Sequence, residues 1–210
     1  DEFHDVATAH CLKQRLVAIH ATALGTTEFD QWSAHAGTIV WSPFSNLWLY
    51  RATTNVVAAH KAGMRICVGS DWGPSGSKNV LGELKVADLW NRGHLDGAFS
   101  DQELCEMVTS NPADGLEWTE HTGRLKQGLQ ADVLVVDGRD SDPYRNLIES
   151  IESNVRLVLV GGKPRYGRTA LMHAALGAAG PSIAALLIQH GASIQARDRE
   201  DSTATILAAR

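Results

Sequence analysis

Met64-Arg65-Ile66-Cys67-Val68-Gly69-Ser70-Asp71 is a short, largely apolar run that ends in a carboxylate. Two similar runs precede it, Leu16-Val17-Ala18-Ile19-His20 and Thr38-Ile39-Val40-Trp41. Runs of this length and composition are typical of strands that are buried on both faces. Segments that predict helices lie between and after them, at residues 26–36 (which we expect to stop at Gly37), 53–62 and 79–91. This alternation of strand and helix predicts an α/β fold built from parallel βαβ units.

The pattern changes after residue 100. Residues 101–108 predict a helix, and Asn111-Pro112-Ala113 begins another, with proline at a favourable place in the first turn. Residues 123–125, 131–137 and 155–162 are predicted as β segments joined by turns. We therefore expect a small sheet appended to the α/β part. Three parallel strands cannot close an eight-stranded βα barrel, which needs about 250 residues.

The composition is that of an ordinary globular protein, with 210 residues, a formal charge of −5 and a hydrophobic fraction of 44%. This length has room for one medium domain or two small ones. Because the chain is mildly acidic and has no basic patch, we expect neither a nucleic-acid partner nor a membrane surface as partner. No apolar run approaches the ~20 residues that a membrane span needs.

The cysteines and the start of the chain bear on where the protein works. Cys11, Cys67 and Cys105 are too few and too scattered for a disulfide framework. They predict a reducing compartment, and we expect a cytoplasmic location. The chain begins without methionine and without a basic, apolar leader, so we expect no signal peptide and a start that is cut from a longer protein.

Two of the predicted strands end in side chains suited to metal chemistry. His20 ends the first run and Asp71 ends the third. In parallel βα folds the C-terminal ends of strands hold the working side chains. Imidazole nitrogen and carboxylate oxygen are both good ligands for Zn²⁺ or Fe²⁺. The residues alone leave two other interpretations open, a structural histidine and an aspartate that only forms a turn or caps a helix.

Three motifs together resemble the metal-dependent amidohydrolase superfamily, in its cytosine deaminase, guanine deaminase and chlorohydrolase branch. They are Leu16-Val17-Ala18-Ile19-His20, Trp41-Ser42-Pro43-Phe44-Ser45-Asn46-Leu47 and Val68-Gly69-Ser70-Asp71-Trp72. Residues 111–113, 123–128 and 131–137 are similar to the closing segment of that family. The resemblance covers about residues 1–165. It implies a partial (β/α) TIM-type barrel over residues 1–110, and a barrel exit helix with small β-sandwich strands over residues 111–165.

The resemblance also implies a chemistry, hydrolysis of carbon–nitrogen bonds other than peptide bonds in a small molecule, a cyclic amidine or an aminated heterocycle. One divalent ion, zinc or iron, would supply a hydroxide that attacks the ring carbon, and ammonia would leave. Asp71 matches a metal ligand that also transfers the proton of the water. His20 matches a catalytic histidine that binds metal in some relatives. The implied substrate-binding residues are Ser42, Ser45 and Asn46, which match a loop that shapes the pocket in the family, and Trp72. Deamination and dechlorination would share these ligands, so both stay open.

The chain departs from the family pattern where other ligands should be. The paired His-x-His of the first strand is absent, since no two of the nine histidines have that spacing. The fifth-strand histidine and its general acid/base glutamate would lie upstream of Asp1. We therefore expect the C-terminal part of such an enzyme, which does not catalyse alone. Glu83 is expected on a solvated helix face, and it could transfer a proton only if that helix faced the pocket.

The last segment, residues 166–210, resembles an ankyrin repeat. The similarity lies in Gly167 to Ala175 and in Leu186 to Ile194, and Thr169 and Thr203 are about one 33-residue repeat apart. We expect a helical, ankyrin-like tail that binds a protein partner. Two alternatives to an enzyme therefore remain, a non-catalytic interaction fragment that carries this tail and a truncated chain that does not fold on its own.

Overall fold

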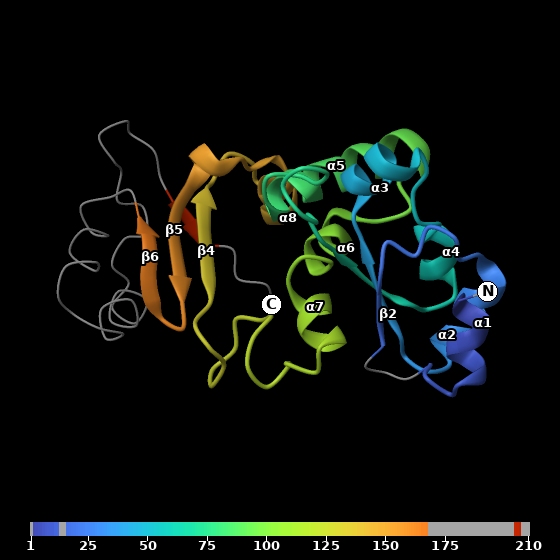
Figure 1. Cartoon of the computed structure of the whole chain (residues 1–210). Helices are drawn as coiled ribbons and strands as arrows, with labels where there is room; N and C mark the ends of the chain where they lie inside the picture. Colours follow the sequence, from blue (N-terminus) through green and yellow to red (C-terminus); the bar gives the residue numbers. More distant parts are fainter. Residues whose placement is uncertain (1, 13–15, 168–203, 207–210) are drawn as a thin grey trace. The chain divides into compact units, whose positions relative to one another are not determined.

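The computed structural model describes residues 2–12, 16–167 and 204–206. The chain divides into two compact units, Asp1–Thr119 and Glu120–Arg210, and each is described by itself (Figure 1). The domain boundaries expected from the sequence stay predictions beside this division. Among the residues described, no helix is long and apolar enough to cross a membrane.

The first unit contains a parallel sheet of three strands in the order β1-β2-β3. Val17 lies opposite Thr38, and Thr38 lies opposite Arg65. The sheet confirms the predicted parallel βαβ arrangement. The elements in chain order are α1 (Glu2–Thr8), β1 (Val17–Ile19), α2 (Thr26–Ser33), β2 (Thr38–Trp41), α3 (Pro43–Tyr50), α4 (Val56–Lys61), β3 (Arg65–Val68), α5 (Val80–His94), α6 (Asp101–Glu106) and α7 (Ser110–Gly115).

The predicted helix at residues 26–36 is shorter than its sequence pattern suggests. It ends at Ser33, and Ala36 takes a left-handed conformation with φ +52°. Gly37 instead makes room for the buried Trp32 ring, because a Cβ on residue 37 would lie 2.1 Å from Trp32 Nε1. The glycine predicted as a helix stop therefore serves the packing of the core.

The core of the first unit lies between the sheet and its helices. α2 packs against α4, and α3 packs against α5 (Figure 1). The largest fully buried apolar side chains there are Trp32, Trp41, Phe29, Ile39, Leu84, Leu104 and Val56. Complete burial of such side chains contributes about 1.5–3 kcal/mol each, so this cluster is a major source of the unit's stability.

The segment after α6 extends the outer edge of β3. Val68 N donates to Met107 O over 2.8 Å, and Asn111 Nδ2 donates to Ile66 O over 2.9 Å. The predicted helix start at Asn111-Pro112-Ala113 is confirmed as α7. A Cβ on Gly115, its last residue, would lie 2.9 Å from the Thr38 side chain. This glycine therefore allows α7 to approach the sheet.

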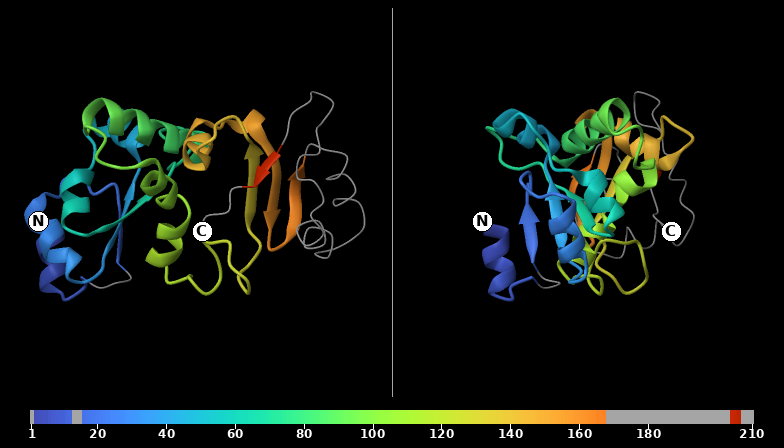
Figure 2. Two further views of the ribbon diagram at one scale, coloured as in Figure 1. Left: turned by 180° about the vertical axis from the view of Figure 1, so that it is seen from behind. Right: turned by 90° about the vertical axis from the view of Figure 1, so that its right-hand side faces the viewer.

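The second unit contains an antiparallel sheet in the order β6-β5-β4-β7 (Figure 2). Its elements are β4 (Val133–Asp137), α8 (Pro143–Glu149), the 3₁₀ helix η1 (Glu152–Asn154), β5 (Val155–Val160), β6 (Lys163–Gly167) and β7 (Ala204–Ile206). Strands predicted at residues 131–137 and 155–162 are confirmed. Residues 123–125 form a bend and irregular chain instead of a β segment.

The expected helical, ankyrin-like tail falls mainly on residues that lie outside the described ranges. Its described residues are extended instead of helical. Tyr166 and Gly167 end β6, and β7 pairs with β4, so that Thr205 lies opposite Val136. The prediction of a helical repeat over residues 166–210 stays a prediction for the remainder.

Candidate functional site

His20 and Asp71 emerge from neighbouring points at the carboxyl end of the sheet. His20 N donates to Val40 O over 2.9 Å, and Gly69 N donates to Trp41 O over 3.0 Å, so both segments follow β2 to its end. Both residues then adopt left-handed backbone conformations, with φ of +69° for His20 and +58° for Asp71. Their side chains meet, with His20 Nε2 3.8 Å from Asp71 Oδ2. Each side chain is about a fifth exposed, at 22% and 23%.

Helix α3 holds both of these side chains. Ser45 Oγ donates to Asp71 Oδ2 over 2.5 Å, and Asn46 Nδ2 lies 3.0 Å from His20 Nδ1. Ser45 and Asn46 are consecutive residues in the first turn of α3, so one helix start contacts both strand ends. The sequence predicts a pocket loop here. The structure shows that this segment is a helix with Pro43 at its first position.

The four expected substrate-binding residues differ in exposure. Ser42, Ser45 and Asn46 are buried, and two of them contact the His20–Asp71 pair. Trp72, which follows Asp71, is 66% exposed. The arrangement leaves the indole of Trp72 open to a ligand, whereas the other three side chains are enclosed by protein.

A second layer of hydrogen bonds orients the Asn46 amide. Trp41 Nε1 donates to Thr53 Oγ1 over 2.7 Å, and Thr53 Oγ1 donates to Asn46 Oδ1 over 3.5 Å. The Thr54 hydroxyl donates to the carbonyl oxygen of His20 and lies 3.3 Å from Asn46 Oδ1. In this arrangement Asn46 directs its NH₂ at His20 Nδ1, so the neutral imidazole holds its proton on Nε2, the atom that faces Asp71.

No motif of the sequence points to Thr53, Thr54 or Tyr50 as residues of the site. The Tyr50 ring meets the His20 ring edge-on, with centroids 5.8 Å apart. Thr53 and Thr54 lie just before the Asn55 cap of α4, and Tyr50 ends α3. Their roles depend on contacts between segments that are far apart in the sequence, and no local motif reports such contacts.

The Ser45 hydrogen bond stabilises the ionised form of Asp71. It is the main reason that the pKa of the Asp71 carboxyl lies below its usual value, and the Trp72 backbone and His20 act in the same direction. Desolvation opposes them. Asp71 is therefore ionised at neutral pH and can accept a proton.

Replacing Ser45 by Ala should raise the pKa of Asp71, which a ¹³C NMR titration of the carboxyl carbon measures directly. A carboxyl whose pKa is lowered by folding stabilises the folded state above the unfolded pKa of about 3.9. That stabilisation is lost as the pH falls through the lowered pKa. S45A should therefore weaken the dependence of stability on pH below about 4. In the control S33A, which removes an exposed hydroxyl bonded to Asp30 O, the Asp71 titration should not move.

The loop after β3 offers a matched pair of glycine substitutions. A Cβ on Gly76 would lie 1.8 Å from Ser70 O, next to Asp71, whereas a Cβ on Gly73 would meet nothing within 4 Å. We expect G76A to lower the free energy of unfolding by about 1–3 kcal/mol through overpacking and to displace the Asp71 backbone. G73A should change it by no more than about 0.5 kcal/mol. Urea denaturation compares the two, and equal effects would contradict the close approach at Gly76.

The donor atoms at this site fit part of a metal centre. His20 and Asp71 provide a nitrogen and an oxygen of the right chemistry. In the part of the chain that the structure describes, no group of three or more His, Cys, Asp or Glu side chains is placed to hold a metal ion. A catalytic zinc usually has three protein ligands and a water. The described residues therefore supply at most two ligands and do not complete a site.

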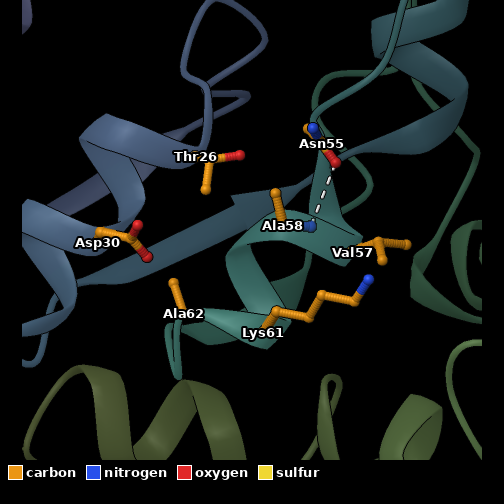
Figure 3. Close-up of a pocket in the computed structure, with 7 residues that line it drawn as sticks. All are labelled: Thr26, Asp30, Asn55, Val57, Ala58, Lys61 and Ala62. Carbon is orange, nitrogen blue, oxygen red and sulfur yellow. Dashed lines mark hydrogen bonds between the residues drawn. The ribbon is translucent and has the colours of Figure 1, made fainter.

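A hollow of about 310 Å³ lies elsewhere in the first unit, between α2 and α4 (Figure 3). It is open to solvent, and its charged lining residues are Asp30 and Lys61. Figure 3 shows the Asn55 side chain at its edge, where it accepts from Ala58 N and so caps α4. The hollow shares no residue with the His20–Asp71 pair.

Two family models match the chain. One is described as the amidohydrolase family and matches residues 1–165, and the other is the ankyrin repeat and matches residues 166–199. A curated relative is the 5-methylthioadenosine/S-adenosylhomocysteine deaminase of Caldicellulosiruptor saccharolyticus, which is 29% identical over 160 residues. The match covers 71% of this chain and 37% of the relative, so the chain spans less than two fifths of that length.

Solved structures are also similar to this chain. An adenosine deaminase from Xanthomonas campestris with bound zinc has a TM-score of 0.72 at 20% identity, over 89% of this chain and 44% of its own. An atrazine chlorohydrolase from Arthrobacter aurescens, complexed with zinc, has a TM-score of 0.64 at 21% identity, over 85% of this chain and 41% of its own. These matches show the α/β fold of the TIM-barrel type, in part, and confirm the predicted fold class at that level.

Proposed function

We propose a hydrolytic deaminase function for the enzyme of which this sequence is a part, because the chain belongs to the amidohydrolase family. The observation that supports it most is the convergence of His20 and Asp71, 3.8 Å apart, at the carboxyl end of a parallel sheet. Asp71 is ionised and partly exposed, so it can accept a proton from an attacking water. The sequence covers only part of its relatives, and we propose that the isolated chain does not catalyse.

The residues of the site divide into two groups in this proposal. Asp71 contacts the reacting atoms, and His20 directs its Nε2–H at the same space and orients water or substrate. Ser45 and Asn46 hold these two side chains, and Ser42 shapes the enclosed wall. We assign the exposed indole ring of Trp72 to stacking on a substrate ring. An aromatic heterocycle suits such a surface.

A single divalent ion, zinc or iron, belongs to this proposal. When bound, it would lower the pKa of a water molecule so that hydroxide forms near neutral pH. Asp71 is the ligand that the geometry favours. His20 could bind metal through Nε2 only after losing the proton held there, so we assign it the orienting role first. The zinc bound in two similar solved structures supports the choice of ion.

The substrate class follows from the relatives named above. We propose an aminopurine nucleoside or a related aminated heterocycle, in which water replaces an amino group and ammonia leaves. A chlorinated triazine would be the substrate if the chain follows its chlorohydrolase neighbour. The few, scattered cysteines of the sequence are the basis of the expected cytoplasmic location, which also stays a proposal.

The test uses the longest protein that the gene encodes, purified without added metal, beside the 210-residue chain. Elemental analysis measures bound metal. Ammonia release is measured with 5′-methylthioadenosine, adenosine and guanine as substrates. Chloride release is measured with atrazine as substrate. We expect about one zinc or iron and ammonia release from the longer protein, and neither from the chain. Chloride without ammonia would replace deamination by dechlorination. If the longer protein contains no metal and releases neither ammonia nor chloride, the proposal that it is an enzyme of this kind is wrong.

A second candidate function rests on the ankyrin match at residues 166–199. We propose that this tail binds a protein partner, with or without an active hydrolase attached. Repeats of this kind bury their faces against neighbours, and a single match leaves such a face to be covered. Deleting residues 168–210 should then abolish binding to any partner found with the whole chain, while the His20–Asp71 site keeps its NMR signals.

A further inference from the structure

Glu83 is a fully buried carboxylate in the first turn of α5. The sequence predicts it on a solvated helix face, and the structure shows that this prediction is wrong. Its Oε1 accepts a hydrogen bond from the backbone N of Phe44 over 2.8 Å, 39 residues earlier in the chain. An ionised carboxylate loses several kcal/mol of hydration when it is buried, so its partners must recover much of that cost. Those partners belong to the two segments that build the candidate site.

The first of these segments is the start of α3. Phe44 lies in the first turn of that helix, where backbone N–H groups have no acceptor within the helix. A carboxylate at this place satisfies one such group and interacts favourably with the helix dipole. The next two residues, Ser45 and Asn46, contact Asp71 and His20. Glu83 therefore fixes the turn from which both contacts are made.

The second segment is the loop after β3, which contains Asp71. Burial raises the pKa of Glu83, and hydrogen bonds from the Ser77 side chain, the Phe44 amide and the Ser77 backbone oppose the rise. The negative charge of Asp71 raises it further. Glu83 thus lies next to Ser77, six residues after Asp71, as well as next to α3, and its buried Oε2 has no hydrogen-bond partner among the described residues.

We propose that Glu83 is a positioning residue, which links the start of α3 to the loop after β3. It thereby keeps Ser45 in contact with Asp71, and Asn46 in contact with His20. It contacts no reacting atom. The geometric part of this inference stands on the chain itself, and only its effect on turnover rests on the proposed function. The two can therefore fail separately.

The experiment compares E83A, E83Q and D88N in the 210-residue chain by amide hydrogen exchange and by ¹H–¹⁵N spectra of the His20 ring. Asp88 is the matched control, a buried acid one turn further along α5 that pairs with Arg92 over 2.6 Å. We expect E83A to speed exchange at Phe44, Ser45 and Asn46 by about tenfold or more, since opening there no longer breaks the Glu83 contact. The His20 ring signals should shift in the same variant.

The conservative variant and the control separate positioning from general stability. E83Q keeps an acceptor for the Phe44 amide, so its exchange should stay within about threefold of wild type at these positions. D88N should lower the melting temperature without changing exchange in the first turn of α3 or the His20 signals. If E83A does not fold, E83D replaces it, because an acid one methylene shorter cannot reach Phe44.

Two results would overturn the inference. One is unchanged exchange at Phe44 to Asn46 in E83A, and the other is an equal local change in D88N. In the longer protein, E83A should lower kcat more than it changes KM, because substrate does not touch Glu83. Loss of local protection in a protein with no deaminase activity would uphold the positioning role and contradict only the proposed function.

Discussion

If the proposed deaminase function holds, replacing Asp71 by Asn should lower the turnover of the longer protein by about 10²–10⁴-fold, the range that positioned acid/base groups contribute. Asn has nearly the same shape as Asp and can still accept the hydrogen bond from Ser45 Oγ, so the loop after β3 should keep its fold. What the substitution removes is the negative charge and the ability to accept a proton. The affinity of the D71N protein for zinc should fall as well, because a neutral amide oxygen is a weaker ligand than a carboxylate.

Steady-state kinetics on the best substrate and a zinc titration of the same preparations measure these effects. The control is D30N, which neutralises an exposed aspartate on α2 at the edge of the hollow in Figure 3. It should keep turnover and zinc affinity within about twofold of wild type. A D71N protein that retains more than about a tenth of wild-type turnover would show that another group accepts the proton.

The strands of the first unit could be predicted from the sequence because burial on both faces leaves a clear local signal. Residues 38–41 and 64–69 are almost continuously apolar, and β2 and β3 lie within them. His20 and Asp71 follow from the same logic, since they end such runs. Helix α3 could not be predicted in this way. Phe44, Trp48, Leu49 and Tyr50 are all exposed on it, so its apolar residues do not form one inward face.

The contacts that organise the site are tertiary and leave no local signal. A Glu and a Lys two residues apart, Glu83 and Lys85, indicate a solvated helix surface when only the local pattern is considered. The burial of Glu83 depends on α3 lying against α5, and the local sequence pattern does not predict α3. In the same way, no local pattern predicts that the Asn46 amide lies next to His20, because this contact depends on the crossing of two distant segments. The implied role of Asn46 in binding substrate stays a prediction.

Replacing Arg156 by Met should destabilise the second unit by about 3–5 kcal/mol, the range for breaking a buried ion pair on one side. Arg156 on β5 is 3% exposed and Asp137 at the end of β4 is 5% exposed. Arg156 Nη2 donates to Asp137 Oδ2 over 2.7 Å, and Nε donates to Oδ1. The substitution leaves the Asp137 carboxylate buried without this partner. The backbone oxygen of Asp137 accepts a hydrogen bond from Asn146 Nδ2 over 2.7 Å. Because Asn146 lies on α8, this helix should also become less stable in R156M.

The distribution of tryptophan allows the two units to be followed separately. All six Trp residues precede residue 120, so Trp fluorescence reports on the first unit, whereas far-UV circular dichroism reports on both. In urea, R156M should move a circular dichroism transition to lower concentration and leave the fluorescence transition in place.

The control R145M removes an exposed pair with Glu149 at 3.5 Å and should cost less than about 1 kcal/mol. The double variant R156M/D137L should recover much of the loss, because no unpaired charge stays buried. Coincident shifts of both signals in R156M would show instead that the two units unfold as one cooperative structure.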